Sequence, residues 1–206
     1  MLIGADGIWS VVRKHLLGDV APRYAGLTMW RAIVEVDAAD MPAVDFTAWW
    51  GPAAKLVYFR SGPTRLSWEA IVASDADGRD VPGDSKRAVL ERFAAFCDQG
   101  LQIVDSTDPR DIFRTDVYDR PPDDHWGAGR VTLLGDAAHP MTFAVGQGAA
   151  QALEDGLAIA DHLSTAGDVE AGLRAYEGER RARSSRFQNL AWTLAAAAPV
   201  GSDRST

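Results

Sequence analysis

The 206-residue sequence predicts a mixed α/β fold, and three observations support this prediction. Residues 24–72 are rich in β-forming side chains, and residues 65–72 alternate between apolar and polar positions as a half-buried strand does. Residues 129–163 pass from a short β-rich stretch through a loop of small residues into a segment with helical spacing. Residues 85–97 and 169–194 carry apolar side chains at helical intervals, which predicts two further helices.

The chain begins with the end of a strand and a glycine-rich turn. Asp6 and Gly7 follow the apolar residues 2–3 and are typical of a turn. Ser10 can cap a helix over residues 11–17, and Gly18 can end it. On these residues alone, Arg13 is either a solvated helix residue or part of a binding site, and neither alternative is favoured.

Residues 24–72 predict an antiparallel sheet with one covered face. Strands are expected at residues 24–36, 46–50, 55–59 and 65–72, with turn residues between them. The aromatic side chains either line a flat, apolar substrate pocket or form the core, and the core is the safer assignment for any single one. The aromatic candidates are Trp30, Trp49, Trp50, Tyr58, Phe59 and Trp68.

The segments after the sheet predict a covering helix, a returning strand and a long helix. Residues 85–97 place Val89, Phe93 and Phe96 at helical spacing, so this helix is expected to pack on the sheet. Residues 112–118 read as a strand that leads back toward the first segment, and residues 119–129 as a loop. Residues 169–194 read as a long helix whose charged part, 177–186, is a solvated face.

Residues 129–163 predict a binding cradle for a cofactor. A buried strand at 130–134 ends at Gly135 and Asp136. A helix opens at residues 146–148, because Ala150, Leu153, Leu157 and Ala160 recur at helical spacing behind it. Small residues let a ligand approach the backbone, and a helix start offers unpaired N–H groups with partial positive charge. Asp136 is an acceptor suited to the hydroxyls of a sugar or ribityl chain. The alternative is an ordinary strand–loop–helix that uses glycine for its turns.

His139 follows this strand, and two roles for it are open. It either handles a proton near the ligand or is a loop histidine that bonds backbone, and the second role is favoured. The four histidines show no metal-binding spacing, so no metal site is expected.

Composition narrows the class of protein. The chain is 47% hydrophobic and 24% charged, as globular proteins are, with a formal net charge of −8. An acidic surface argues against nucleic acid and anionic membranes as partners. One cysteine excludes an internal disulfide framework, and no apolar run is long enough to cross a bilayer. No signal peptide is recognisable at the N-terminus, so a cytoplasmic location is the default expectation.

The letters LLGDAAHP followed by GQGAAQALED resemble the second flavin motif of the FAD-dependent aromatic hydroxylases, which are class A flavoprotein monooxygenases. Members of the salicylate-hydroxylase and zeaxanthin-epoxidase kind look most similar. The resemblance implies that Asp136 bonds the ribityl chain of FAD and that the backbone amides of residues 146–149 face the flavin ring. The flavin-binding residues implied here are Gly135, Asp136, Pro140, Gly146, Gln147, Gly148 and Ala149.

The first residues, LIGADGIWSVVRKHL, resemble the middle motif of the same family. That motif lies near the FAD pyrophosphate and has been linked to the pyridine nucleotide, which implicates Gly4, Asp6, Gly7 and Arg13. Phe143 stands where the family usually has a proline beside the oxygen-reacting side of the flavin, so it removes a rigid residue and adds bulk.

The resemblance also predicts the domain organisation. Residues 1–23 and 112–206 would form part of a three-layer FAD-binding domain, and residues 24–111 a β-sheet substrate domain with a covering helix. The Gly-x-Gly-x-x-Gly fingerprint that grips the pyrophosphate in this family does not occur in the chain. We therefore expect either a fragment of a longer product or a chain that self-associates or needs a separate N-terminal half.

The expected function is that of an FAD-dependent, NAD(P)H-using monooxygenase that hydroxylates or epoxidises a small aromatic or unsaturated substrate with O2. Two alternatives remain: a truncated, non-catalytic remnant or partner subunit, and a flavin-independent binding protein. The substrate-lining candidates are Trp30, Trp50, Trp68 and Phe143. The sequence assigns no catalytic acid or base and does not specify the substrate.

Overall fold

The computed structural model describes residues 1–51, 53–78, 80, 84–96 and 98–197. These residues form two compact units. The first unit contains Met1–Ala25 and Tyr118–Ala197, and the second contains the described part of Gly26–Val117. Each unit has its own hydrophobic core. The mixed α/β class predicted from the sequence is confirmed.

The first unit is built on a small sheet with the order β1-β8-β7. β1 (Leu2–Gly4) pairs in parallel with β8 (Val131–Leu133), and β8 pairs antiparallel with β7 (Gly127–Ala128). Helix α1 (Val11–Leu17) follows β1 and has the predicted ends, because Ser10 caps it and Gly18 ends it.

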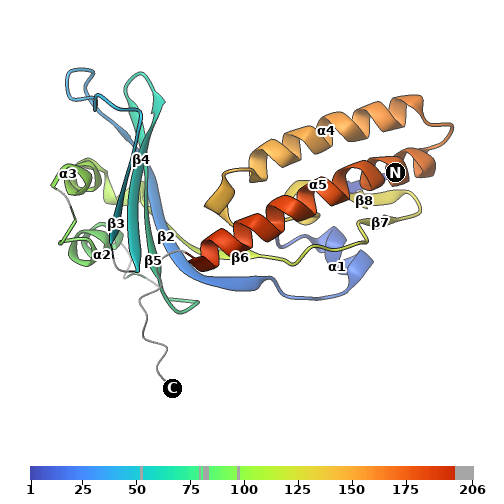
Figure 1. Ribbon diagram of the computed structural model, residues 1–206, viewed down its shortest axis with the longest axis horizontal. Helices are drawn as coiled ribbons and strands as arrows, with labels where there is room; N and C mark the ends of the chain where they lie inside the picture. Colours follow the sequence, from blue (N-terminus) through green and yellow to red (C-terminus); the bar gives the residue numbers. More distant parts are fainter. Residues whose placement is uncertain (52, 79, 81–83, 97, 198–206) are drawn as a thin grey trace. The chain divides into compact units, whose positions relative to one another are not determined.

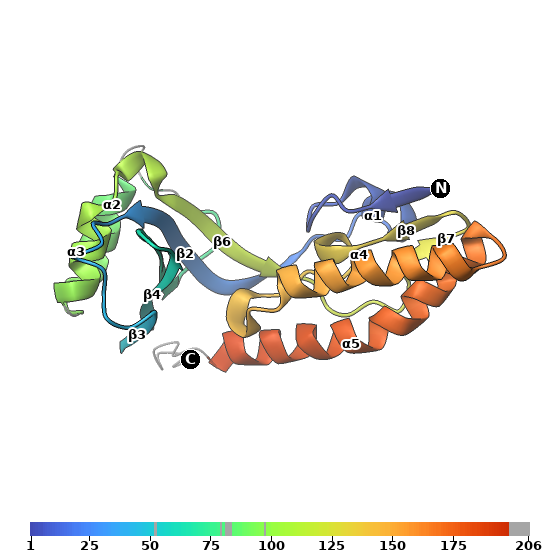
Figure 2. The same ribbon diagram turned by 90° about the horizontal axis from the view of Figure 1, so that it is seen from above.

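Two long helices complete the first unit. α4 (Gly148–Thr165) and α5 (Val169–Ala197) lie side by side in both views (Figures 1 and 2). Short 3-10 turns, η2 (Gly135–Ala137) and η3 (Phe143–Val145), connect β8 to α4. Trp126, Leu133, Leu173 and Tyr176 are central to the core of this unit, and each is at most 1% exposed.

Helix α4 turns a different face inward from the one its leucines suggest. Leu153 and Leu157, whose spacing predicted the helix, are 73% and 75% exposed. The buried side of α4 carries Gln151, Asp155 and Ile159. The helix itself was predicted correctly, but polar groups with partners in α5 occupy its inner face.

The second unit is a five-stranded sheet with the order β3-β4-β5-β2-β6. β2 pairs antiparallel with β5, β5 with β4 and β4 with β3, so the predicted antiparallel pairing is observed in these strands. β2 and β6 continue into the first unit. The strands are β2 (Arg23–Glu35), β3 (Phe46–Gly51), β4 (Ala54–Gly62), β5 (Arg65–Ala73) and β6 (Phe113–Asp119).

Helices α2 (Ser85–Arg92) and α3 (Asp98–Ser106) cover one face of this sheet (Figure 2). Val89 and Phe93 are fully buried against inward-facing strand residues such as Leu56, Leu66 and Trp68. The covering helix was predicted over residues 85–97, whereas α2 ends at Arg92 and residue 97 lies outside the described residues. α3 was not predicted, nor was the 3-10 turn η1 (Pro109–Asp111).

Among the described residues, no helix combines the length and apolar character needed to cross a lipid bilayer.

Candidate functional site

Asp136 lies next to the beginning of α4. A Cβ atom placed on Gly148 would be 4.0 Å from Oδ1 of Asp136. Asp136 is exposed as a residue, yet the surrounding protein partly desolvates its carboxylate and raises its pKa, while the nearby His139 acts in the opposite direction. The carboxylate and the helix start, which the sequence placed together, therefore meet at one place.

The backbone at this place requires glycine. Gly135 has a φ of 60° and Gly146 a φ of 62°, both in the left-handed region. The N–H of Gly146 donates to the carbonyl of Phe143 at 2.8 Å, which closes the turn before α4. Gln147 occupies the N-cap position, and within the described chain its side chain makes no capping hydrogen bond. The first N–H groups of α4, from Gly148 and Ala149, thus have no side-chain cap.

A buried carboxylate fixes this loop from below. Asp155 accepts hydrogen bonds from the backbone N–H of Gly135 at 3.0 Å and from Nε of Arg180 at 2.8 Å, and its Oδ2 lies 2.6 Å from Nε2 of His139. Asp155 and His139 are fully buried. Burial tends to raise the pKa of Asp155, but the hydrogen bonds from His139 and Arg180 outweigh burial and lower it.

His139 has a different role from the one favoured by the sequence. Its ring bonds the Asp155 side chain instead of the backbone, and it lies 5.2 Å from the Trp126 ring. Nδ1 has no hydrogen-bond partner among the described residues. The ring is therefore part of the support beneath the loop.

Arg180 and Gln151 extend the support, and neither was predicted from the sequence. Arg180 Nη2 donates to Oε1 of Gln151 at 2.9 Å, and Nη1 donates to Glu154 at 2.7 Å. The available signal was the spacing of Gln151, Asp155 and Ile159, which puts two polar residues on the face that carries a buried isoleucine. Their partner lies on another helix, so the sequence gives no direct sign of it.

The residues of the N-terminal motif, LIGADGIWSVVRKHL, have structural partners. Asp6 accepts hydrogen bonds from Ser10 Oγ at 2.5 Å and from the N–H of Val11 at 2.8 Å, so it holds the start of α1. Gly4 permits close packing, because a Cβ there would lie 2.7 Å from Cβ of Val12. Gly7 has a φ of 78°, as the predicted turn requires.

Arg13 connects the N-terminal motif to the loop that carries Asp136. It is 7% exposed, and Nη1 donates to the carbonyls of Ala137 and Ala138, each at 3.1 Å. Nη2 donates to Asp123 at 2.9 Å. Of the two alternatives for Arg13, the solvated helix residue is therefore wrong. Buried Pro140 is held nearby, where its carbonyl accepts a hydrogen bond from Gln188.

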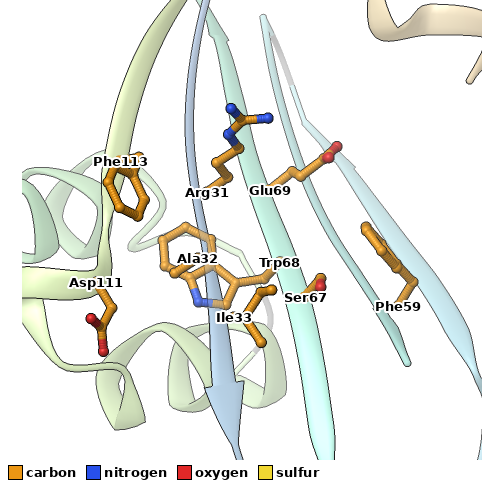
Figure 3. A pocket seen from close by; sticks show the side chains of 9 residues that line it. All are labelled: Arg31, Ala32, Ile33, Phe59, Ser67, Trp68, Glu69, Asp111 and Phe113. Atoms are coloured by element: carbon orange, nitrogen blue, oxygen red, sulfur yellow. The ribbon is translucent and has the colours of Figure 1, made fainter. Parts of the chain in front are cut away.

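The second unit contains a cavity of about 530 Å³ (Figure 3). Its lining combines apolar side chains, including Ile33, Phe59 and Phe113, with three charged residues, which are Arg31, Glu69 and Asp111. A cavity of this size suits a small organic ligand, since such sites measure roughly 300–1,000 Å³.

The aromatic residues that were expected to line a substrate pocket lie in different places in the structure. Trp68 borders the cavity, although it is 1% exposed and its Nε1 donates to Thr107 in the core. Trp30 is buried in the core, and Trp50 is 62% exposed on β3 with Lys55 over its ring. Neither Trp30 nor Trp50 lines the cavity. Phe143 is half-buried in η3, at the turn that precedes α4.

Several known proteins resemble this chain in both sequence and fold. The family model described as "FAD binding domain" matches residues 1–193. Zeaxanthin epoxidase of Oryza sativa subsp. japonica is 37% identical over 93% of the chain, and aurachin C monooxygenase/isomerase of Stigmatella aurantiaca is 38% identical over 91%. The chain spans 30% and 48% of these two relatives.

Solved structures agree with the sequence relatives. HpxO of Klebsiella pneumoniae, in complex with FAD and uric acid, superposes with a TM-score of 0.90 at 29% identity, over 98% of this chain and 52% of that one. A salicylate hydroxylase–substrate complex gives a TM-score of 0.77 at 25% identity, over 98% of this chain and 56% of that one. The chain thus belongs to the FAD binding domain family and is related to FAD-dependent monooxygenases, as its two motifs predicted.

Proposed function

We propose that this chain supplies the flavin-contacting loop and the substrate pocket of a monooxygenase that uses FAD, NAD(P)H and O2. The substrate would be a small aromatic or unsaturated molecule that is hydroxylated or epoxidised. The observation that carries the proposal is the Asp136 carboxylate beside the uncapped start of α4, in a protein of the FAD binding domain family. The assignment of residues 1–23 and 112–206 to the flavin part, and of 24–111 to the substrate part, belongs to the same proposal.

The residues at the α4 start fit the chemistry of a flavin. Asp136 can accept hydrogen bonds from ribityl hydroxyls, and the N–H groups of Gly148 and Ala149 can donate to an electron-rich ring edge. Gly146 leaves open space, since a Cβ there would meet nothing within 4 Å. When bound, FAD would supply electron transfer and oxygen activation, which side chains cannot provide.

The chain's own residues would position the ligands. Arg13 and Asp155 hold the loop on which Asp136 stands, so the carboxylate is fixed before the cofactor arrives. The apolar side chains in the cavity of the second unit would pack against a flat substrate. NAD(P)H as the reductant rests on the resemblance alone, and the cytoplasmic location remains a prediction.

A competing proposal is a non-catalytic remnant or partner subunit. The chain spans less than half of the two curated relatives named above. β1 lies at the edge of its sheet, and Leu153 and Leu157 of α4 are exposed. We propose that further chain, either a separate N-terminal half or a second copy, covers such surfaces in the working protein.

Titration of the purified chain with FAD tests the proposal. Bound FAD should change the visible flavin spectrum, and Asp136→Asn should weaken binding about ten-fold or more, because a hydrogen bond to a charged group contributes roughly 1.5–3 kcal/mol. Asp161→Asn is the matched control, since it removes an exposed carboxylate of α4 and should leave affinity unchanged. A folded chain that does not bind FAD, or equal affinities for the two variants, would contradict the proposal.

NADPH oxidation separates the enzyme from the remnant. The measurement uses the same preparation with FAD, O2 and NADH or NADPH, and light scattering records whether the chain is monomeric. FAD binding with turnover supports the monooxygenase. FAD binding without turnover, in a preparation of established molar mass, supports the partner-subunit alternative.

A further inference from the structure

The cavity of the second unit contains two opposite charges at one register position. Arg31 on β2 lies directly opposite Glu69 on β5 in an antiparallel pair. Side chains of directly opposed residues stand on the same face of a sheet, so both charges face the cavity. Ile33 and Ser67, two residues along the same strands, line it as well (Figure 3).

The side chains of Arg31 and Glu69 do not contact each other directly. No ion pair or hydrogen bond joins Arg31 and Glu69 in the part of the chain that the structure describes. Figure 3 shows the guanidinium and the carboxylate ending apart, with a gap between them. Strand neighbours with opposite charges usually gain from direct pairing. A ligand between Arg31 and Glu69 would give each group a partner.

The Glu69 carboxylate has an unfavourable environment without a ligand. Glu69 is half-buried, and burial raises its pKa, while the charges of Arg31 and Lys55 act to lower it. Lys55 on β4 lies over the Trp50 ring, with Nζ 4.4 Å from the ring centroid. A donor brought by a ligand would give this carboxylate the partner that the described residues leave out.

The rest of the lining suits a flat ring. Ile33 and Phe113 are 58% and 64% exposed although both are large and apolar, and Phe59 is half-buried. In Figure 3, Phe113 lies on the Arg31 side of the charged pair, Phe59 on the Glu69 side, and Ile33 below them. Apolar walls with a small number of convergent polar groups are typical of sites that bind and orient small molecules.

We propose that Arg31 and Glu69 together determine substrate specificity in this cavity, a proposal that rests on the proposed monooxygenase function. They select a planar ring system that carries a hydrogen-bond acceptor next to a hydrogen-bond donor, as in a lactam or a ring hydroxyl beside a carbonyl. Arg31 donates to the acceptor oxygen, and Glu69 accepts from the neighbouring N–H or O–H. A hydrocarbon ring leaves both groups unpaired and is discriminated against.

Ligand binding to the full chain tests this inference without FAD or NAD(P)H. The probe is 2-quinolone, a flat lactam, and the comparison ligands are N-methyl-2-quinolone, which lacks the donor, and naphthalene, which lacks both groups. Calorimetry gives the affinities, and quenching of tryptophan fluorescence reports on the cavity, which Trp68 borders. We expect 2-quinolone to bind about ten-fold or more tightly than either comparison ligand, the scale of one hydrogen bond to a charged group.

Two substitutions assign this preference to the charged pair. Glu69→Leu should abolish the preference for 2-quinolone over its N-methyl form, and Arg31→Met should weaken both lactams. Glu35→Leu is the matched control, because Glu35 is on β2 but pairs with Arg65 outside the cavity, at 2.5 Å. Circular dichroism establishes that each variant is folded.

The outcomes distinguish this inference from the proposed function. If FAD binds but the unaltered chain does not prefer 2-quinolone, or if Glu69→Leu retains the preference, the specificity inference is overturned and the flavin site stands. If the preference and its dependence on Glu69 are observed while FAD does not bind, the donor–acceptor site is supported and the monooxygenase function is lost. Equal binding of all three ligands also overturns the inference.

Discussion

Asp155 and Glu154 are neighbouring carboxylates of α4 with opposite surroundings. Asp155 is fully buried among His139, Arg180 and the Gly135 amide, whereas Glu154 reaches solvent and pairs with Arg180 and Arg183. Asp155→Asn should lower the free energy of unfolding by about 3–5 kcal/mol, because it leaves a buried guanidinium and ring without their charged partner. Glu154→Gln should cost about 0–1 kcal/mol. Urea denaturation measures both, and similar costs would contradict this account of the network.

The same carboxylate predicts how stability depends on pH. The pKa of Asp155 is lowered in the folded protein from an ordinary value of 3.8. A lowered folded-state pKa contributes stability that is complete above the unfolded value and is lost as pH falls through the folded value. The unaltered chain should therefore lose stability below about pH 4, and Asp155→Asn should flatten this part of the curve.

Residues close together in the chain were easier to predict than residues that meet across the fold. Asp136 and Gly148 stand at a strand end and the following helix start, so local chemistry was enough to associate them. Asp155 and Arg180 are 25 positions apart on different helices. In the sequence, a carboxylate on a charged helix cannot be distinguished from a solvated one, because its partner on another helix is not apparent. This network was therefore not predicted.

At the scale of elements, α4 depends on the left-handed residue that precedes it. Gly146 has a φ of 62°, whereas Gly156 lies inside α4 with nothing within 4 Å of a Cβ. Gly146→Ala should destabilise the chain by about 1–2 kcal/mol, the cost of a left-handed non-glycine residue. Gly156→Ala should stabilise it by about 0.5–1 kcal/mol, because alanine restricts the unfolded chain and favours a helix. Thermal unfolding should shift in opposite directions, and shifts of the same sign would contradict the assigned backbone geometry.

Elements with a periodic pattern or clear end signals were predicted, and several elements without these signals were not. The alternation along β5 and the turn before it gave the β4–β5 hairpin, and the caps of α1 gave both of its ends. β7 has two residues, which is too short for any periodicity to appear. The α4 leucines gave the helix but not its buried face, since packing on α5 satisfies polar groups that the sequence pattern alone leaves unpaired.

At the scale of the whole molecule, the chain interleaves two units. The first unit is formed by both ends of the described chain, and the second by its middle. Sequence composition gives no boundary between them, and the predicted assignment to flavin and substrate parts came from a family resemblance. The unfolding transitions of the chain would show whether each unit folds and binds its ligand independently.

Separate hydrophobic cores predict two unfolding transitions. Leu173 is fully buried in the first unit, and Leu66, 1% exposed, is buried in the second. Leu173→Ala should lower one transition and Leu66→Ala the other, each by about 2–5 kcal/mol, because truncation of a buried leucine removes apolar contacts and leaves a cavity. FAD at 100 times its Kd should raise only the transition lowered by Leu173→Ala, by about 2.7 kcal/mol, since a ligand stabilises only the unit that binds it. Differential scanning calorimetry measures these shifts. A single transition lowered by both variants would mean that the two cores unfold together, and stabilisation of the Leu66 transition by FAD would place the flavin site in the wrong unit.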